Sequence, residues 1–255
     1  MKADITAILT VYRRPQNLAR QIESLRNQTI PPKEIWVWIN YHEDNNELID
    51  FAGADKVFNC DHNWKFFGRF AAGLLADTQY LAIFDDDTIP GNQWFENCLS
   101  SYAELEKQGY VSPILGSAGV LLNSAMYLNH SRHGWPSQNT AIERVDLVGH
   151  AWFFTRSNLS FFWQEKPSSW DNGEDIHFSC CAQKYGGVQT FCPPHPADNK
   201  EMWGSLYAVE LGTDKVATSN NTWISHSTFF SQRDHVVDNA LKGGWLTCKE
   251  IKPQM

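Results

Sequence analysis

Apolar and polar positions alternate with two different periods along the first half of the chain. Short, nearly continuous apolar runs are typical of buried strands, and apolar residues spaced three or four positions apart are typical of helices. The predicted strands are 4–11, 34–40, 56–60 and 79–84, and the predicted helices are 15–28, 66–76 and 94–108. Strands that alternate with helices form mainly parallel sheets covered on both faces. This half therefore predicts an α/β fold.

The second half has shorter and less regular apolar segments. The predicted strands are 116–122, 145–155 and 188–192, and the predicted helices are 174–185 and 231–241. The polar stretch HSRHGWPSQNT, between the first two of these strands, is predicted to be a loop. No Gly/Ser-rich linker separates the halves. We therefore predict one domain over residues 1–255, with a mainly parallel central sheet flanked by helices and a loop-rich second half that shapes a pocket.

Charge and apolar run length exclude two kinds of partner. The chain has a net charge of −8, and no run rich in Lys or Arg supplies the positive surface that nucleic-acid binding requires. No window reaches the roughly 18 apolar residues of a membrane span, and the N-terminal MKADITAILTVYRRP lacks the apolar length of a signal peptide. We expect no nucleic-acid partner and no transmembrane segment.

Cysteine and tryptophan usage add two expectations. The six cysteines contain no Cys-x-x-Cys pair, which favours reduced thiols in a cytoplasmic protein over a disulfide framework. The chain has 11 tryptophans, 8 tyrosines and 15 phenylalanines, many of which must serve the core. Flat apolar rings with a polar edge also suit the C–H faces of sugars, so the composition slightly favours a carbohydrate ligand.

Three consecutive aspartates follow a buried strand in the stretch LAIFDDDTIPG. In open α/β sheets, ligands bind beyond the carboxyl ends of the strands, and adjacent carboxylates repel one another unless a cation lies between them. Mg²⁺ and Mn²⁺ accept such oxygen ligands. Because side chains alternate along a strand, Asp85 and Asp87 are expected to share a metal site, and Asp86 to point to the other side, toward a group such as a ribose hydroxyl. The alternative is a solvated turn before Pro-Gly.

A second acidic pair, Glu174 and Asp175, stands at the start of a predicted helix in SSWDNGEDIHFS. Acidic residues in a first helical turn are favoured by the helix dipole, so helix capping explains the pair without any chemistry. Trp170 and Gly173 beside the pair indicate the lip of a pocket instead. A carboxylate facing a sugar pocket could act as a general base for an acceptor hydroxyl.

The order of four segments resembles the motif order of GT-A glycosyltransferases, particularly the family 2 type. The segments are TVYRRPQNLARQIESLRNQTIPPKEIWVWIN, LAIFDDDTIPG, VDLVGHAWFFTR and WDNGEDIHFS, and the resemblance covers residues 4–186. Exostosin-like glycosyltransferases, with a DDD triplet and a later Glu-Asp, are also similar, as are small viral enzymes that decorate capsid glycans. The resemblance implies a Rossmann-like GT-A sheet, with a nucleotide-binding half over about 1–110 and an acceptor-binding half over about 111–255.

The resemblance also implies roles for individual residues. Contacts to the nucleotide-sugar donor are expected from Thr10, Tyr12, Arg13, Asn40, Arg69, Asp85, Asp86, Gly149 and His150. Asn40 stands where family 2 members often have an acidic residue. The implied metal ligands are Asp85 and Asp87 of the DxD motif, together with His226 in WISHSTFF, since some GT-A enzymes add a late histidine; a structural histidine is the alternative. The implied catalytic residues are Asp175, as the base, and its neighbour Glu174.

The implied activity is transfer of a hexosyl or deoxyhexosyl group from a nucleotide-diphosphate sugar to a hydroxyl of a glycan or glycoconjugate. UDP is the commonest carrier among similar enzymes, and Mn²⁺ or Mg²⁺ is the implied cofactor. Asp175 as base implies inversion, whereas closer kinship to exostosin-like enzymes implies retention. A nucleotidyltransferase is disfavoured because TVYRRPQN has no glycine-rich loop. A non-catalytic carbohydrate-binding protein would use the aromatic residues but has no need of a DDD strand end.

Overall fold

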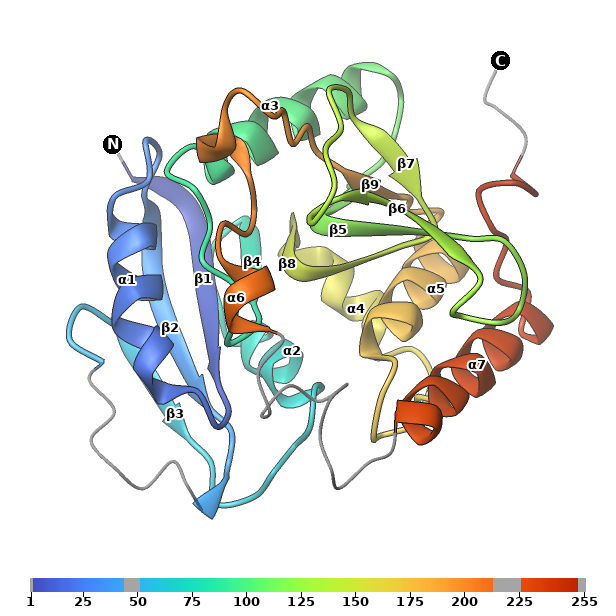
Figure 1. The fold of residues 1–255 in the computed structure, drawn as a ribbon, viewed down its shortest axis with the longest axis horizontal. Helices are drawn as coiled ribbons and strands as arrows, with labels where there is room; N and C mark the ends of the chain where they lie inside the picture. The colour runs from blue at the N-terminus through green and yellow to red at the C-terminus, as the bar shows by residue number, and fades with distance from the viewer. Residues whose placement is uncertain (1, 44–50, 213–225, 252–255) are drawn as a thin grey trace.

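The computed structural model describes residues 2–43, 51–212 and 226–251, and these residues form one sheet of nine strands (Figure 1). The sheet order is β3-β2-β1-β4-β8-β5-β9-β7, and β6 pairs with β5 at the side. The strands are β1 Ala3–Val11, β2 Pro32–Ile39, β3 Lys56–Asn59, β4 Tyr80–Phe84, β5 Ile114–Leu122, β6 His130–Gly134, β7 Glu143–Val145, β8 Leu147–Thr155 and β9 Thr190–Cys192. The α/β prediction is confirmed.

Strand direction divides the sheet into two regions. The four strands of the first half, β3, β2, β1 and β4, pair in parallel as predicted. In the second half, β8 runs antiparallel to both β4 and β5, β6 runs antiparallel to β5, and β7 runs antiparallel to β9. Of the pairs in this half, β5 and β9 are parallel. The antiparallel strands therefore lie in the half that was expected to be rich in loops.

Two details of the second half differ from the sequence prediction. The polar stretch predicted as a loop contains β6, whose residues 130–134 alternate too little in hydrophobicity to be recognised. The predicted strand 145–155 is divided into β7 and β8 around Asp146, whose backbone N–H donates to the carbonyl of Val120. The carboxylate of Asp146 also accepts from the N–H of Leu122, so this residue joins the end of β5.

Helices cover both faces of the sheet. The α-helices are α1 Leu18–Arg26, α2 Gly68–Gly73, α3 Trp94–Lys107, α4 Leu159–Phe162, α5 Glu174–Gly186, α6 Ala208–Leu211 and α7 His226–Lys242. Short 3-10 turns in the described part of the chain are η1 Pro15–Asn17, η3 Arg156–Asn158 and η4 Lys200–Met202. The predicted helix 231–241 lies inside α7, which runs alongside α5 (Figure 1).

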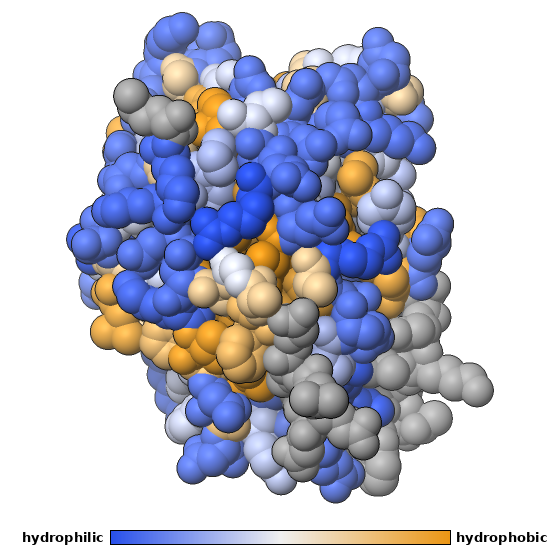
Figure 2. Space-filling view, turned by 90° about the vertical axis from the view of Figure 1, so that its left-hand side faces the viewer, coloured by the Kyte–Doolittle hydropathy of each residue, from blue (hydrophilic) through white to orange (hydrophobic). Residues whose placement is uncertain are grey.

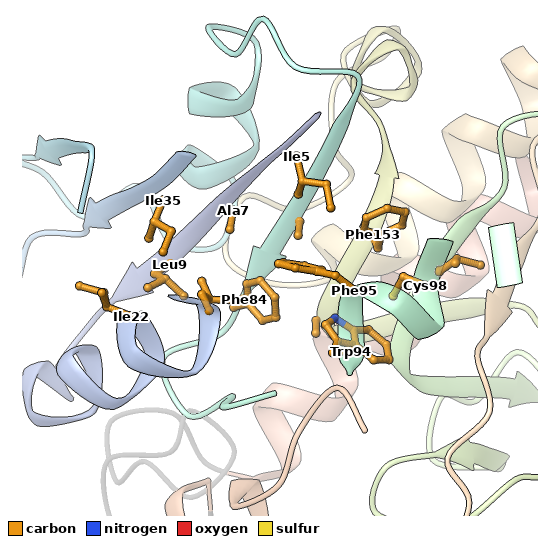
Figure 3. Close-up of a cluster of buried hydrophobic side chains, with 14 of the residues drawn as sticks. Ile5, Ala7, Leu9, Ile22, Ile35, Phe84, Trp94, Phe95, Cys98 and Phe153 are labelled. Carbon is orange, nitrogen blue, oxygen red and sulfur yellow. The ribbon is translucent and has the colours of Figure 1, made fainter. Parts of the chain in front are cut away.

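The alternation of side chains along the strands produces two separate cores. On one face, β1, β2 and β4 pack against α1 and α3, and Figure 3 shows this cluster. Its members include Ile5, Leu9, Ile22, Phe84, Phe95 and Phe153. On the other face, Ile8 and Ile83 pack against α2, α4 and α5 through Phe70, Phe162 and Phe178. Neighbouring residues of one strand thus point to opposite layers, because side chains alternate between the two faces of a sheet.

A third cluster fastens the C-terminal helix to the second half of the sheet. Val236 and Val237 of α7 pack with Ile176 and Cys180 of α5 and with Trp245, which is 2% exposed. The contact brings α7 beside the first turn of α5, where the acidic pair stands. The C-terminal helix is therefore in a position to contribute side chains to a site there.

Several tryptophans serve the core, as expected, and others do not. Trp36, Trp94, Trp152 and Trp245 are almost fully buried. Apolar residues also gather on the surface, in the lower part of the face that Figure 2 shows. All six cysteines are free thiols, which agrees with the expectation of reduced cysteines. Among the described residues, no helix has the length and apolar character needed to cross a membrane.

The parallel strands bring distant polar segments to one edge of the sheet. In the register of the sheet, Val11 pairs with Ile39 and Leu9 pairs with Phe84. The residues that follow these strands, including Asn40 and Asp85, therefore meet at the carboxyl edge. This is the edge where open α/β sheets bind ligands.

Candidate active site

A cleft of about 380 Å³ opens at the carboxyl edge of the parallel strands. Its lining includes nearly all of the residues that the sequence suggested for a site: Thr10, Tyr12, Asn40, Arg69, Asp85, Asp86, Asp87, Gly149, His150, Glu174 and Asp175. The fold thus brings the two acidic motifs, which are far apart in sequence, to one place. His226 begins α7, but its side chain lies outside the described residues.

The end of β1 differs from the sequence expectation by one residue. Arg13 has a φ of 64°, in the left-handed region, and Arg14 rather than Arg13 lines the cleft. Arg14 is only 6% exposed, and its Nη1 donates to Asp86 Oδ1 at 2.7 Å and lies 3.7 Å from Asp87 Oδ2. No motif marked Arg14 in the sequence, because its partners are more than 70 positions away.

The aspartate triplet follows β4 in a turn, and its side chains point in two directions. Asp86 points to Arg14, whereas Asp85 and Asp87 face His150. Gln21 of α1 fixes the turn that carries the triplet. Its side-chain amide donates to the backbone carbonyl oxygens of Asp85 and Thr88, each at 2.8 Å. The solvated-turn interpretation does not fit, because Asp86 and Asp87 are only 12% and 13% exposed.

Asp85, Asp87 and His150 form a group suited to a divalent cation. One ligand atom of each residue lies within 4.8 Å of the others. His150 Nδ1 is 3.7 Å from Asp85 Oδ2 and 3.9 Å from Asp87 Oδ1, and it is buried without a hydrogen-bond partner among the described residues. Two carboxylates and an imidazole are a donor set that Mn²⁺ accepts. The residues therefore fit the cofactor expected from the sequence, although the histidine in this group is His150, which was expected beside the sugar, and not His226.

A second group of possible metal ligands lies away from the cleft, and its carboxylate is already paired with a lysine. Glu165, His177 and Cys181 also bring their ligand atoms within 4.8 Å. Both oxygens of Glu165 accept hydrogen bonds from Lys184 Nζ at 3.0 Å, and Tyr185 donates a further one at 2.9 Å. His177 Nε2 lies 2.9 Å from the carbonyl oxygen of Phe162. These partners give the group a structural explanation.

Crowding and burial shift the protonation of the triplet. Burial raises the pKa of Asp86 to about 7, and the charges of Asp87 and Asp85 add to this effect against the opposing influence of Arg14. Burial alone would also raise the pKa of Asp87, but His150 and Arg14 lower it below its ordinary value. His150 in turn has a raised pKa, because the two carboxylates outweigh the effect of burial. Asp87 and His150 therefore each favour the charged form of the other. A bound cation would change this balance.

Arg69 of α2 connects the two acidic motifs. Its guanidinium is buried, and it donates to Asp85 and, at 3.1 Å, to Glu174 Oε1. It also donates to Thr10 Oγ1 at 3.3 Å and lies 4.8 Å above the ring of Trp152. A buried cation held by two carboxylates fixes the distance between the DDD turn and the first turn of α5. Arg69 therefore lies between the two acidic motifs and links them through its ion pairs.

Asp175 is paired with an arginine that sequence reasoning missed. Arg233 of α7 donates to Asp175 Oδ2 at 2.6 Å and to Asn172 Oδ1 at 3.1 Å, and its guanidinium lies 4.0 Å from the ring centre of Tyr127. The other oxygen, Oδ1, accepts from the backbone N–H of Ile176 at 2.9 Å, which is part of the helix-start role considered for the pair. Arg233 is recognisable only from the packing of α7 on α5.

Glu174 gives the apoprotein a pH-dependent stability. Burial and the neighbouring charge of Asp175 raise the pKa of Glu174 to about 7, although Arg69 and Arg233 oppose the shift. A carboxyl with a higher pKa in the folded state takes up protons on folding, so its contribution is present at low pH and is lost as pH rises through about 7. We expect the free energy of unfolding to fall by about 1–3 kcal/mol between about pH 5 and about pH 8.

The measurement is denaturant unfolding without added metal, at several pH values, on the wild type and on Glu174→Gln. The amide keeps an oxygen for Arg69 but cannot titrate, so the variant should have a flatter dependence on pH. Parallel curves for the two proteins would contradict the assignment of the raised pKa to Glu174.

Comparisons with known proteins were consistent with this geometry. The model of the family described as glycosyl transferase family 2 matches residues 6–162. The S. aureus TarS 1–349 crystal structure is similar with a TM-score of 0.52 and 17% identity, over 78% of this chain and 62% of that one. The TarS 1–349 structure in complex with UDP has the same TM-score and 15% identity, over 75% of this chain and 60% of that one. No curated protein matched.

A longer TarS structure is also similar, with a TM-score of 0.52 and 15% identity, over 76% of this chain and 37% of that one. The chain thus spans less than two thirds of the length of each of these TarS chains. At this level of identity the likeness concerns the fold, and together with the family match it confirms the predicted Rossmann-like GT-A architecture.

Proposed function

Because the chain belongs to glycosyl transferase family 2, we propose that it transfers a sugar from a nucleotide-diphosphate sugar to a hydroxyl group of a glycan or glycoconjugate. The observation that carries the proposal is the meeting of two motifs in one cleft. The metal-type group of Asp85, Asp87 and His150 and the candidate base Asp175 line the same cavity. A donor held at the first and an acceptor held at the second would be within one site.

The donor side of the cleft is the carboxyl edge of β1, β2 and β4, in the half of the chain over about 1–110. Thr10, Tyr12 and Asn40 present hydroxyl and amide groups there, which suit a nucleoside. We propose UDP as the carrier, which agrees with the UDP in one of the similar TarS structures. The transferred group is a hexosyl or deoxyhexosyl unit, placed beside Gly149 and His150.

Asp85, Asp87 and His150 would hold Mn²⁺ or Mg²⁺. The bound ion supplies Lewis-acid stabilisation of the charge that develops on the leaving diphosphate. Arg14 and Arg69 belong to the chain itself and add two positive charges at the same end of the cleft, each anchored on an aspartate of the triplet. Anchoring keeps these charges in place before the substrate arrives, so little reorganisation is needed during the reaction.

Asp175 is the group that we assign to take the proton from the acceptor hydroxyl. Arg233 and the N–H of Ile176 each occupy one lone pair of its two oxygens, and a carboxylate offers about four. Capacity therefore remains for a hydrogen bond from the acceptor, while the two existing bonds fix the orientation of the carboxylate. With no nucleophile required between donor and acceptor, this assignment implies a single displacement with inversion at the anomeric carbon.

Glu174 is assigned a positioning role. Its carboxyl is directed to Arg69 rather than left unpaired in the cleft, and its raised pKa leaves it partly protonated near neutral pH. It would act through Arg69 by keeping this side chain between the two motifs. Donor and acceptor halves of the site then keep their separation.

Titration calorimetry tests the donor assignment directly. UDP and GDP are titrated into the protein with Mn²⁺ and, separately, with a chelator. We expect UDP to bind with Mn²⁺ and to lose at least about tenfold in affinity with the chelator, because Asp85, Asp87 and His150 would hold an ion that offsets the negative charge of the diphosphate. Absence of binding by either nucleotide in both conditions would contradict the proposal.

A further inference from the structure

A second pocket, of about 590 Å³, lies beside the active-site cleft and has mainly aromatic walls. Five of its lining residues are large aromatic side chains: Trp38, Trp64, Phe67, Trp163 and Trp170. They come from β2, from the loop before α2, from the end of α4 and from the loop before α5. Segments far apart in sequence thus contribute rings to one cavity, and none of these rings belongs to the cleft described above.

The aromatic walls are held in fixed positions. Trp38 lies so close to the start of α2 that a Cβ on Gly68 would be 2.3 Å from its Cζ2 atom, so only glycine fits there. The ring of Phe67 packs edge-on against Trp170, with ring centres 4.9 Å apart. Despite this order, Trp64 and Trp170 remain 54% and 47% exposed. Large, ordered and exposed aromatic faces in a concave site are typical of a ligand-binding surface.

The pocket is continuous with the active-site cleft. Asn63, Lys65 and Asp171 line both cavities, and Lys65 Nζ lies 3.5 Å from Asp171 Oδ1 at their boundary. Asn63 is tied to the donor side of the cleft, because it accepts from Asn40 Nδ2 at 2.7 Å and donates to the Tyr12 hydroxyl at 3.2 Å. A molecule that extends from the cleft past this boundary enters the aromatic pocket.

The chemistry of the lining fits a sugar ring better than a hydrocarbon or a base. A pyranose has apolar C–H faces and polar edges, and it therefore matches aromatic walls with polar groups at one side, here His62, Asn63 and Lys65. The indole N–H groups of Trp38 and Trp163 are buried and have no hydrogen-bond partner among the described residues. A hydrocarbon would make no use of the polar groups of His62, Asn63 and Lys65 that line the pocket. Thr10, Tyr12 and Asn40 do not line this pocket themselves, whereas Trp170 and Asp171 bring to it the loop that leads to Asp175.

We propose that the aromatic pocket binds a sugar ring of the acceptor glycan, next to the ring that receives the transferred sugar. The acceptor is then an oligosaccharide chain, free or on a glycoconjugate, and not a monosaccharide. The inference rests on the proposed function for the direction of transfer. Binding of the glycan itself needs neither donor nor metal, and this allows the two proposals to be tested separately.

The test is direct glycan binding without nucleotide. The labelled full chain is applied to an array of mono- and oligosaccharides on an alkyl linker, with linker-only spots. We expect wild type to bind a set of oligosaccharides, and Trp64→Ala and Trp170→Ala each to reduce this binding about tenfold, because each removes one stacking face. Trp170→Phe keeps a ring and should retain most of the binding. Leu75→Ala, which changes an even more exposed apolar residue outside the pocket, should behave as wild type.

Three outcomes would overturn the inference. Binding to no oligosaccharide, or binding that Trp64→Ala and Trp170→Ala leave unchanged, would exclude this pocket as a glycan site. Signal on the linker-only spots that is lost in the tryptophan variants would identify an apolar occupant instead. Asp87→Asn, which should disable donor binding, is expected to bind glycans like the wild type. If the protein does not transfer sugars, the array result would be unchanged. That failure would be seen only in experiments with nucleotide sugar.

Discussion

Asp175→Asn is expected to lower kcat for sugar transfer by about 10²–10⁴-fold, because the amide cannot accept the proton of the acceptor hydroxyl. The amide oxygen can still receive the hydrogen bond from Arg233, which in the wild type is 2.6 Å long, so the fold of the first turn of α5 should be retained. The affinity for UDP with Mn²⁺ should be nearly unchanged. The measurement is steady-state transfer together with calorimetry on the same preparations.

A matched change far from the cleft is the control for this experiment. Asp77→Asn alters an aspartate whose side chain is 82% exposed, and it should leave kcat at the wild-type value. Wild-type kcat in Asp175→Asn would contradict the assignment of the base. The anomeric configuration of the product, determined by NMR, is a second check: inversion agrees with a single displacement, and retention would exclude Asp175 as the base of such a step.

Asp87→Asn is expected to remove the metal-dependent part of UDP binding, with a loss of at least about tenfold in affinity in the presence of Mn²⁺, as with the chelator. The reason is that Asp87 faces His150 from the same side as Asp85, and an amide replaces a charged oxygen in this group. His150→Ala should act in the same direction. Calorimetry with and without a chelator measures both variants.

Binding in the presence of the chelator shows whether Asp87→Asn affects only the metal or disrupts the whole UDP site. Asp87→Asn and wild type should bind UDP with similar, weak affinity once Mn²⁺ is removed. If the two proteins instead bind UDP equally well with Mn²⁺ present, the DDD turn holds no ion that matters for the donor. Asp77→Asn again serves as the control of equal charge change.

Regular elements and the acidic motifs were predictable because local patterns encode them. The buried strand before the triplet, with Leu81 to Phe84 alternating between two cores, placed Asp85 at the edge of the sheet. In each case the signal lies within a few residues of the feature that it predicts.

The residues that were missed depend on contacts between distant parts of the chain. Arg14 and Arg233 became recognisable only when the fold placed them against Asp86 and Asp175, 72 and 58 positions away. His150 was expected beside the sugar, and its approach to the aspartates follows from the pairing of β8 with β4, where Ala151 is opposite Phe84. An antiparallel partner for β4 could not be inferred from periodicity alone.

The aromatic pocket shows the same limit. Excess tryptophan suggested a carbohydrate ligand, but composition cannot say which rings are in the core and which form a surface. Trp36 and Trp38 are two positions apart on one strand, and both point to the face that α2 covers. Trp36 is 1% exposed, whereas Trp38 lines the pocket because Gly68 leaves room beside it.

The decisive experiment for metal-dependent sugar transfer is the release of nucleoside diphosphate from a set of nucleotide sugars. The wild-type protein is incubated with each donor, with Mn²⁺ and with a chelator, and free UDP or GDP is measured over time. We expect slow release from at least one donor with Mn²⁺, and release that stops with the chelator and in Asp87→Asn. No release from any donor, or release that is the same with and without the metal, would contradict a metal-dependent glycosyltransferase in this cleft.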